Sequence, residues 1–344
     1  MKILITGGGG FIGSRLATAL LARGRLASAP IERIVLADQV APRAELTSDR
    51  RVEARVGALA EQCEALGRED FGGVFHLASA VSGECEADFD LGLRSNLDTT
   101  RALLDALRAA SQRGTPPARL VFSSSVAVFG PDPSLPLPPL VGDDTFPAPK
   151  TSYGTHKLMC EQLIADYSRK GYVDGRSARL MTVTVRPGRP NGAASSFFSG
   201  IVREPLAGVE AICPVSPDVS HPLTSAARTV EGLIAVYEAS IDQLGGRLGL
   251  NLPALNASVA EMLAALEEVA GPEVRERVRF VRDETIAGIV ANWPRGATAK
   301  RAERLGLQPE RSFADIIRRY IADCRAAPDG AQALKGLDER KAKA

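Results

Sequence analysis

A tyrosine and a lysine stand four positions apart at the start of a predicted helix. The stretch from Tyr153 to Lys157 reads YGTHK, and residues four positions apart share one face of a helix. Free tyrosine titrates near pH ~10, so a tyrosine that removes a proton near neutrality needs a neighbouring positive charge. Lys157 would supply that charge, and the pair predicts a general acid/base. The alternative is an exposed tyrosine and lysine on a surface helix.

Three consecutive serines, Ser123 to Ser125, follow an apolar run that is typical of a buried strand. Side chains at the carboxyl end of a parallel strand lie where open α/β sheets bind their ligands. Serine hydroxyls in loops also bond to nearby backbone groups, and we expect one or two of the three to do only that. The run therefore predicts at least one hydroxyl in a binding site.

A glycine-rich loop, TGGGGFIG, ends at Gly13 between a predicted strand and a predicted helix. Glycines allow a tight turn there, and they bring backbone N–H groups and the helix N-terminus close to a pyrophosphate. A purely structural turn is the alternative interpretation. Asp38 ends the next predicted strand. Its carboxylate can accept both ribose hydroxyls of an adenosine and would repel a 2′-phosphate, which favours NAD over NADP.

The elements that must position these residues alternate along the chain. We expect strands at residues 2–6, 34–37, 52–56, 74–77, 120–122 and 180–185, with a further strand near residue 280. We expect helices at residues 11–23, 96–110 and 153–169. Strands that alternate with helices predict an α/β fold, a doubly wound parallel Rossmann sheet with a smaller C-terminal substrate-binding region.

This pattern divides the chain into three predicted parts. Residues 1–187 form an NAD-binding Rossmann domain, and residues 188–325 form mainly a substrate-binding region, some elements of which return to the first domain. Residues 326–344 are polar and rich in small side chains, which predicts a flexible tail.

Composition excludes several classes of function. The 344 residues carry a net charge of +1, with 45% hydrophobic and 24% charged residues, so we expect a sizeable core and no binding of nucleic acid or membranes. The five cysteines form no CxxC or Cys/His cluster, so we expect neither a metal site nor a disulfide framework. The N-terminus lacks the apolar segment of a signal peptide, and a cytoplasmic location is expected.

Taken together, these motifs resemble the extended short-chain dehydrogenases/reductases, the NAD-dependent epimerase/dehydratase type that includes nucleotide-sugar epimerases. The matching elements, in chain order, are the glycine loop, the acid after the second strand, the HLAS stretch at residues 76–79, a helix asparagine, one serine, the YxxxK pair and a Pro-Gly after a strand. The resemblance implies catalysis by Ser125, Tyr153 and Lys157, with Lys157 lowering the pKa of Tyr153.

The same resemblance implies the residues that hold NAD. They are Gly7, Gly10, Phe11, Ile12, Gly13, Asp38, Leu77, Ala78, Ser79, Asn96, Tyr153, Lys157 and Pro187. It also implies a homodimer that pairs the helices at residues 96–110 and 153–169 of each subunit.

The substrate half departs from the nucleotide-sugar members, because the stretches that hold a nucleotide diphosphate there are missing. An arginine fork suits a carboxylate, so the sequence indicates a small acid as the substrate instead. The candidate substrate-binding residues are Ser82, Ser125, Tyr153, Arg186, Arg189, Asn191, Ser195 and Ser196, with His221 further along. The alternatives are that Arg189 is a surface arginine and that Arg186 is structural.

Long segments at residues 81–96, 167–180 and 186–208 resemble family members that oxidise four-carbon sugar acids. That resemblance implies oxidation of the C2 hydroxyl of D-erythronate to 2-dehydro-D-erythronate, with Tyr153 as the general base. Two alternatives stay open: an NAD-dependent nucleotide-sugar epimerase, and a non-catalytic protein that only binds NAD.

Overall fold

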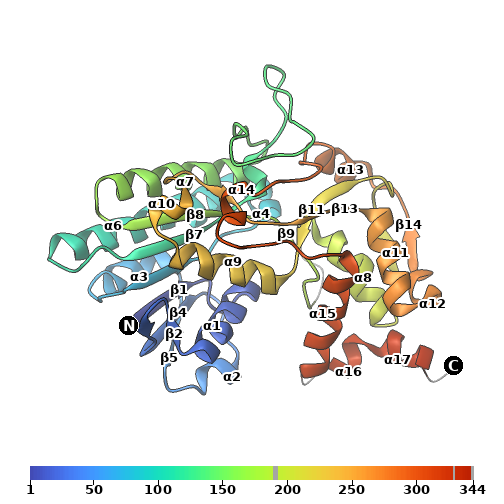
Figure 1. The fold of residues 1–344 in the computed structure, drawn as a ribbon, viewed down its shortest axis with the longest axis horizontal. Helices are drawn as coiled ribbons and strands as arrows, with labels where there is room; N and C mark the ends of the chain where they lie inside the picture. The colour runs from blue at the N-terminus through green and yellow to red at the C-terminus, as the bar shows by residue number, and fades with distance from the viewer. Residues whose placement is uncertain (189–192, 328–329, 342–344) are drawn as a thin grey trace.

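The computed structural model describes residues 1–188, 193–327 and 330–341. A central sheet of seven parallel strands runs in the order β12-β8-β7-β6-β1-β4-β5 (Figure 1). Its strands are β1 (Lys2–Thr6), β4 (Arg33–Asp38), β5 (Val52–Val56), β6 (Gly73–His76), β7 (Arg119–Ser125), β8 (Asp174–Leu180) and β12 (Leu250–Asn251). After β1, the chain adds β4 and β5 on one side of that strand. It later adds β6, β7, β8 and β12 on the other side. This topology confirms the doubly wound Rossmann sheet and leaves a crevice at the carboxyl ends of β1 and β6.

Helices cover both faces of this sheet (Figure 1). On one face lie α1 (Phe11–Arg23) and α9 (Ala226–Glu238), and on the other lie α3 (Leu59–Leu66), α6 (Thr99–Gln112) and α7 (Ser152–Arg169). Strand β1 serves both cores, because successive side chains of a strand point to opposite faces. Ile3 and Ile5 belong to the core under α1 and α9, whereas Leu4 belongs to the core under α3, α6 and α7.

The second region lies to the right in Figure 1 and has its own core. A three-stranded sheet runs in the order β13-β11-β9, and a two-stranded parallel sheet joins β10 and β14. Its elements are β9 (Thr182–Val183), α8 (Ser196–Leu206), β10 (Ala211–Cys213), β11 (Ser220–Thr224), β13 (Leu255–Ser258), α11 (Val259–Ala270), α12 (Pro272–Arg275), β14 (Val278–Phe280), α13 (Glu284–Val290) and α15 (Phe313–Ala326). Strand β14 fulfils the prediction of a strand near residue 280.

The remaining elements are short. They are β2 (Arg25–Leu26), β3 (Ala29–Pro30), α2 (Ala44–Thr47), α4 (Ser82–Ala87), α5 (Phe89–Gly92), the π-helical turn η1 (Leu93–Asp98), the 3₁₀ turn η2 (Val126–Val128), α10 (Ile241–Leu244), α14 (Lys300–Glu303), α16 (Gly330–Ala333) and α17 (Lys335–Lys341). Within the described ranges, no helix is long and apolar enough to cross a bilayer.

The strand expected at residues 180–185 is wrong in its bounds. The sheet strand β8 is Asp174–Leu180, and the chain then leaves the central sheet so that β9 pairs with β11. Two arginines, Arg176 and Arg179, interrupt the apolar pattern of β8, although both are buried. Their charges are paired with Asp174 and Glu161, respectively. Partners of this kind allow arginine inside a sheet, and apolar periodicity does not register them.

The segment predicted to be a flexible tail contains two short helices within its described residues. Helix α15 runs to Ala326, and α16 and α17 follow it. Leu334 and Leu337 are buried in the core of the second region. The burial of these two apolar side chains favours the packing of the segment against this core.

Candidate active site

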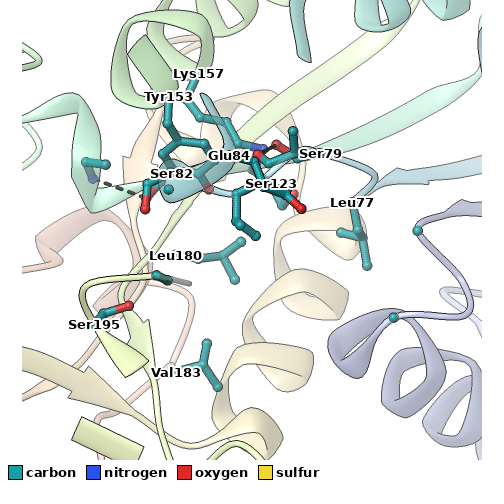
Figure 2. A pocket seen from close by; sticks show the side chains of 18 of the residues that line it. Leu77, Ser79, Ser82, Glu84, Ser123, Tyr153, Lys157, Leu180, Val183 and Ser195 are labelled. Carbon is teal, nitrogen blue, oxygen red and sulfur yellow. Dashed lines mark hydrogen bonds between the residues drawn. The ribbon is translucent and has the colours of Figure 1, made fainter. Parts of the chain in front are cut away.

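A cavity of about 1600 Å³ lies between the carboxyl ends of the central strands and the second region. Of the predicted residues, those that line it are Gly7, Gly10, Phe11, Ile12, Gly13, Asp38, Leu77, Ala78, Ser79, Ser82, Ser125, Tyr153, Lys157, Arg186, Ser195 and Ser196. Figure 2 shows Tyr153 and Lys157 on one side of this space and Leu180, Val183 and Ser195 across from them. The structure therefore brings most of the candidate residues together.

Two of the predicted residues that the structure describes, Asn96 and Pro187, are not found in the lining. Pro187 is exposed next to the cavity, and Arg189 and Asn191 lie outside the described residues. Asn96 is buried, and its amide oxygen accepts the Ala80 N–H at 2.7 Å and the Ser79 hydroxyl at 3.0 Å. These bonds hold the loop after β6, and a cofactor contact by Asn96 stays a prediction.

The glycine loop has the geometry of a phosphate cradle. Gly7 adopts a φ of 72°, which favours glycine, and a Cβ on Gly13 would lie 2.1 Å from the Gly7 carbonyl oxygen. The loop and the first turn of α1 therefore pack in a way that larger residues would prevent. The cavity wall here is backbone, so the residues present fit a pyrophosphate at the N-terminus of α1.

Asp38 lies at the end of β4, where the second strand of a dinucleotide site places an acid. Its two carboxylate oxygens accept the backbone N–H groups of Gly9 at 3.0 Å and Val40 at 3.1 Å. These bonds fix the orientation of the carboxylate beside the glycine loop. The carboxylate borders the cavity and fits the ribose of an adenosine.

Lys157 is buried beneath the tyrosine. Its Nζ donates to the carbonyl oxygen of Ser123 at 2.8 Å and lies 5.5 Å from the centroid of the Tyr153 ring. Burial lowers the pKa of Lys157 to about 8. The ammonium is therefore fixed next to the phenol and retains its charge at neutral pH.

Each of the three serines has a different partner. The Ser125 hydroxyl bonds with Tyr153 and accepts the backbone N–H of Ala127 at 3.1 Å. The hydroxyl of Ser123 donates to a backbone carbonyl at 3.3 Å, and that of Ser124 donates to a carboxylate of α7. Ser125 is therefore the serine that meets the tyrosine, in keeping with its predicted role.

The pKa of Tyr153 runs against the expected direction in the protein alone. Burial raises it, whereas the hydrogen bond with Ser125 and the positive charge of Arg186 act to lower it. Desolvation therefore outweighs the favourable charges. The phenol is protonated at neutral pH until a further positive charge or a strong hydrogen bond stabilises the phenolate.

Arg186 provides a second cation near the tyrosine. Its Nε donates to the Val183 carbonyl at 3.1 Å, and its Nη2 lies 3.5 Å from the Ser195 hydroxyl. Its own backbone N–H donates to Ser199 at 3.0 Å, which fixes the turn after β9. The guanidinium is thus held at the cavity wall within electrostatic reach of Tyr153.

The far wall of the cavity comes from residues that sequence reasoning missed. Around α13 it is formed by Ile286, Ile289, Asn292, Trp293 and Pro294. No motif marks them, and they follow the tyrosine by more than a hundred positions in the chain.

His221, which the sequence did single out, also lines this wall. Its Nδ1 donates to the Pro294 carbonyl at 3.0 Å, so its Nε2 accepts the Thr182 hydroxyl at 2.8 Å. Burial lowers the pKa of His221 to about 4, and the ring is neutral at pH 7. His221 therefore joins β9, β11 and the segment after α13, and does not act as a charged ligand.

Comparison with known proteins assigns the family. The model of the NAD dependent epimerase/dehydratase family matches residues 3–234, which is more than half of the chain. The chain belongs to this family. Its cofactor is NAD, and its motifs are those of an NAD-dependent dehydrogenase of the extended short-chain type.

Several relatives extend over almost all of the chain. D-erythronate dehydrogenase of Cupriavidus necator is 47% identical over 95% of this chain and 100% of its own length. D-erythronate dehydrogenase of Haemophilus influenzae is 40% identical over 93% of this chain and 99% of its own. A solved structure described as a nucleoside-diphosphate-sugar epimerase of Agrobacterium tumefaciens is 42% identical, covers 94% of each chain and superposes with a TM-score of 0.89.

Proposed function

We propose that this protein oxidises the C2 hydroxyl of D-erythronate to 2-dehydro-D-erythronate, with NAD as the oxidant. The observation that carries the proposal is the position of Arg186, a cation at the wall of an NAD-family cavity and within electrostatic reach of Tyr153. A small acid has one carboxylate to neutralise, and an arginine fork matches it. The two relatives named D-erythronate dehydrogenase support the same substrate.

In the proposed reaction, Tyr153 takes the proton of the C2 hydroxyl while Ser125 holds the same oxygen. The C2–H bond breaks as the C2–O bond becomes a carbonyl, and bound NAD would supply the acceptor for the hydride that leaves C2. The proton passes from Tyr153 to solvent. Lys157 lies 5.5 Å from the Tyr153 ring and favours the phenolate by its charge.

The substrate acid is placed by charge and by hydroxyl groups. Arg186 binds the carboxylate, and Ser82, Ser195 and Ser196 on the cavity wall offer partners for the acid and its hydroxyls. Arg189 and Asn191 remain predicted contributors. The apolar side chains around α13 cover the opposite side and match the carbon chain of a short acid.

A nucleotide-sugar epimerase is the second candidate, because the solved relative from Agrobacterium tumefaciens carries such a description. An epimerase returns its hydride to the substrate and releases no NADH. The sequence lacks the family's diphosphate-binding stretches, which favours the dehydrogenase. Net NADH formation separates the two activities.

The test is absorbance of NADH with purified protein, NAD and D-erythronate, run beside L-threonate and a UDP-sugar. We expect NADH with D-erythronate and none with the UDP-sugar. Tyr153→Phe should abolish turnover with little loss of NAD binding. Silence with D-erythronate, or wild-type turnover by Tyr153→Phe, would refute the assignment.

The role of Arg186 has its own test. Arg186→Met removes a charge-assisted bond, which corresponds to a rise of about 10- to 100-fold in KM for the acid. The matched control is Arg318→Met, which removes an exposed arginine of α15 that does not line the cavity. An unchanged KM in Arg186→Met would remove Arg186 from the substrate site.

A cytoplasmic homodimer completes the proposal. The expected interface uses α6 and α7, and Met159 of α7 is an exposed apolar side chain available for it. Sedimentation of the purified protein measures the oligomeric state, and a monomer would contradict this part.

A further inference from the structure

Helix α7 carries a third polar residue in line with its two catalytic ones. Tyr153, Lys157 and Glu161 recur every four residues and therefore share one face of the helix. This face lies against the carboxyl end of β7, where Lys157 donates to the Ser123 carbonyl at 2.8 Å. One turn further on, the Ser124 hydroxyl donates to Oε1 of Glu161 at 2.5 Å. Two consecutive residues of β7 are thus tied to two consecutive turns of α7.

Glu161 is itself firmly held. Arg179 of β8 binds it through two hydrogen bonds, Nε to Oε1 at 2.9 Å and Nη2 to Oε2 at 2.8 Å. Both side chains are at least 95% buried. A bidentate pair in such a site has little freedom, because each charge depends on the other. A Cβ at Gly249 would lie 2.5 Å from a Glu161 oxygen, so the backbone also packs tightly against the carboxylate.

The next residue of β7 is Ser125, the serine that meets Tyr153. The strand pairs in register with β8, with Ser124 opposite Arg179 and Ser125 opposite Leu180. The carboxylate therefore anchors the strand one residue before the hydroxyl that must be placed. It also anchors the helix one turn after the ammonium that must be placed.

We propose that Glu161 is a positioning residue, which through Ser124 and Arg179 fixes Ser125 and Lys157 relative to Tyr153. It touches none of the reacting atoms. This inference rests on the proposed function, since it assigns those three residues to the reaction. It adds a residue that no motif in the sequence singled out.

The charge of Glu161 has an effect besides geometry. Burial lowers the pKa of Lys157, whereas Cys160, Cys85 and Glu161 act to raise it. The other groups around the ammonium are the neutral ring of His76, the phenol of Tyr153 and the ring of Phe122. Glu161 is the group among these that carries a formal negative charge at neutral pH. Its removal should lower the pKa of Lys157 further.

The first experiment removes the link from β7 and leaves the ion pair in place. Ser124→Ala deletes one hydroxyl, and Ser177→Ala is the control, since Ser177 is equally buried on neighbouring β8 and its hydroxyl has no hydrogen-bond partner. We expect kcat of Ser124→Ala to fall about tenfold with KM for NAD unchanged, because misplacement of a catalytic group acts on the chemical step. Equal kcat in the two variants would overturn the proposal.

The second experiment removes the charge and keeps the shape. In Glu161→Gln, the alkaline fall of kcat should move to lower pH, an effect that a merely structural role would not produce. An unmoved alkaline limb overturns the electrostatic part. If Glu161→Gln does not fold, the comparison of Ser124→Ala with Ser177→Ala still decides the positioning role.

The proposed function can fail while the inference about Glu161 still stands. If wild-type protein forms no NADH from any acid, that function fails, and the inference is then tested on the Lys157 ammonium itself. NMR titration of isotope-labelled lysine, with Lys157→Met to identify the signal, gives the pKa of Lys157. Glu161→Gln should lower this titration midpoint, because a nearby negative charge is lost. The same midpoint in both proteins would overturn the inference.

Discussion

Acidification from pH 7 to pH 5 should weaken the fold through two buried histidines. Burial lowers the pKa of His76 to about 3 and that of His221 to about 4, both from 6.5. Each neutral ring is held at both nitrogens: His76 by the hydroxyls of Thr6 and Thr100, and His221 by Thr182 and a backbone carbonyl. Protonation would add an N–H to the ring nitrogen that now accepts a hydrogen bond from a threonine hydroxyl. That hydroxyl would lose its acceptor or would have to rotate.

The direction of the change in stability follows from the number of protons that the folded and the unfolded chain bind. Below pH 6.5 the unfolded chain takes up a proton at each histidine, and the folded chain does not until the pH reaches about 4 and 3. Stability is therefore lost as the pH falls through this window. From pH 6.5 to pH 5 the loss is one and a half units at about 1.36 kcal/mol per unit, or about 2 kcal/mol for each histidine. The two together give about 4 kcal/mol, a large part of the 5–15 kcal/mol of a typical domain.

Carboxylates titrate mainly below the range from pH 6.5 to pH 5, so they contribute little to this change in stability. Asp49, whose pKa is lowered to about 2 by hydrogen bonds from Arg51, loses its contribution only as the pH falls below its ordinary value of 3.8. His156 is the remaining histidine of the chain, and burial lowers its pKa as well. It acts in the same direction and adds to the effect.

Urea unfolding at pH 7, 6 and 5 measures the effect directly. We expect the free energy of unfolding to fall by about 4 kcal/mol, and about half of this dependence to disappear in His221→Asn. His76→Asn should remove the other half. A free energy that is constant from pH 7 to pH 5 would refute the reasoning, and so would a pH dependence that neither variant changes.

Three further predictions concern the cofactor site. Gly13→Ala places a methyl group against the Gly7 carbonyl, so Kd for NAD should rise at least about tenfold in a fluorescence titration, while Gly288→Ala, which has open space around it, should leave Kd unchanged. Asp38→Ser removes the charge that repels a 2′-phosphate, so the ratio of kcat/KM for NADP to that for NAD should rise, and an unchanged ratio would exclude Asp38 from cofactor choice. Because burial lowers the pKa of Lys157 to about 8, kcat/KM should fall as the pH rises past that value, and a flat profile would contradict the role of its charge.

The parts of the site that are close in sequence could be predicted from it. The glycine loop, Asp38, Ser125 and the YxxxK pair sit at strand ends or within one helix, so spacing alone brings them to one edge of the sheet. The prediction failed where a partner is remote. The arginines of β8 interrupt the apolar pattern by which a buried strand is predicted. Their acidic partners, which allow them to be buried, cannot be recognised from that pattern.

Two other features depend on packing that no motif describes. The far wall around Trp293 reaches the cavity only because the segment after α13 folds back, where its backbone binds His221. The pKa of Tyr153 depends on the balance between desolvation and nearby charge, and spacing alone reveals only the charge. Sequence reasoning therefore identified candidate catalytic groups that the structure brings to one cavity, and it misjudged the environment of Tyr153.

The last strand of the central sheet has a consequence for how the chain is made. β12 pairs Leu250 with Ala178 of β8, although about seventy residues separate the two strands. Leu233 of α9 likewise enters the core that β1 shares with α1. A chain released from the ribosome at residue 187 would leave β8 as an open edge and α1 without its neighbour, a surface prone to pair with other chains. The nucleotide-binding half is thus completed by residues synthesised well after it, and no single cut yields two independent pieces.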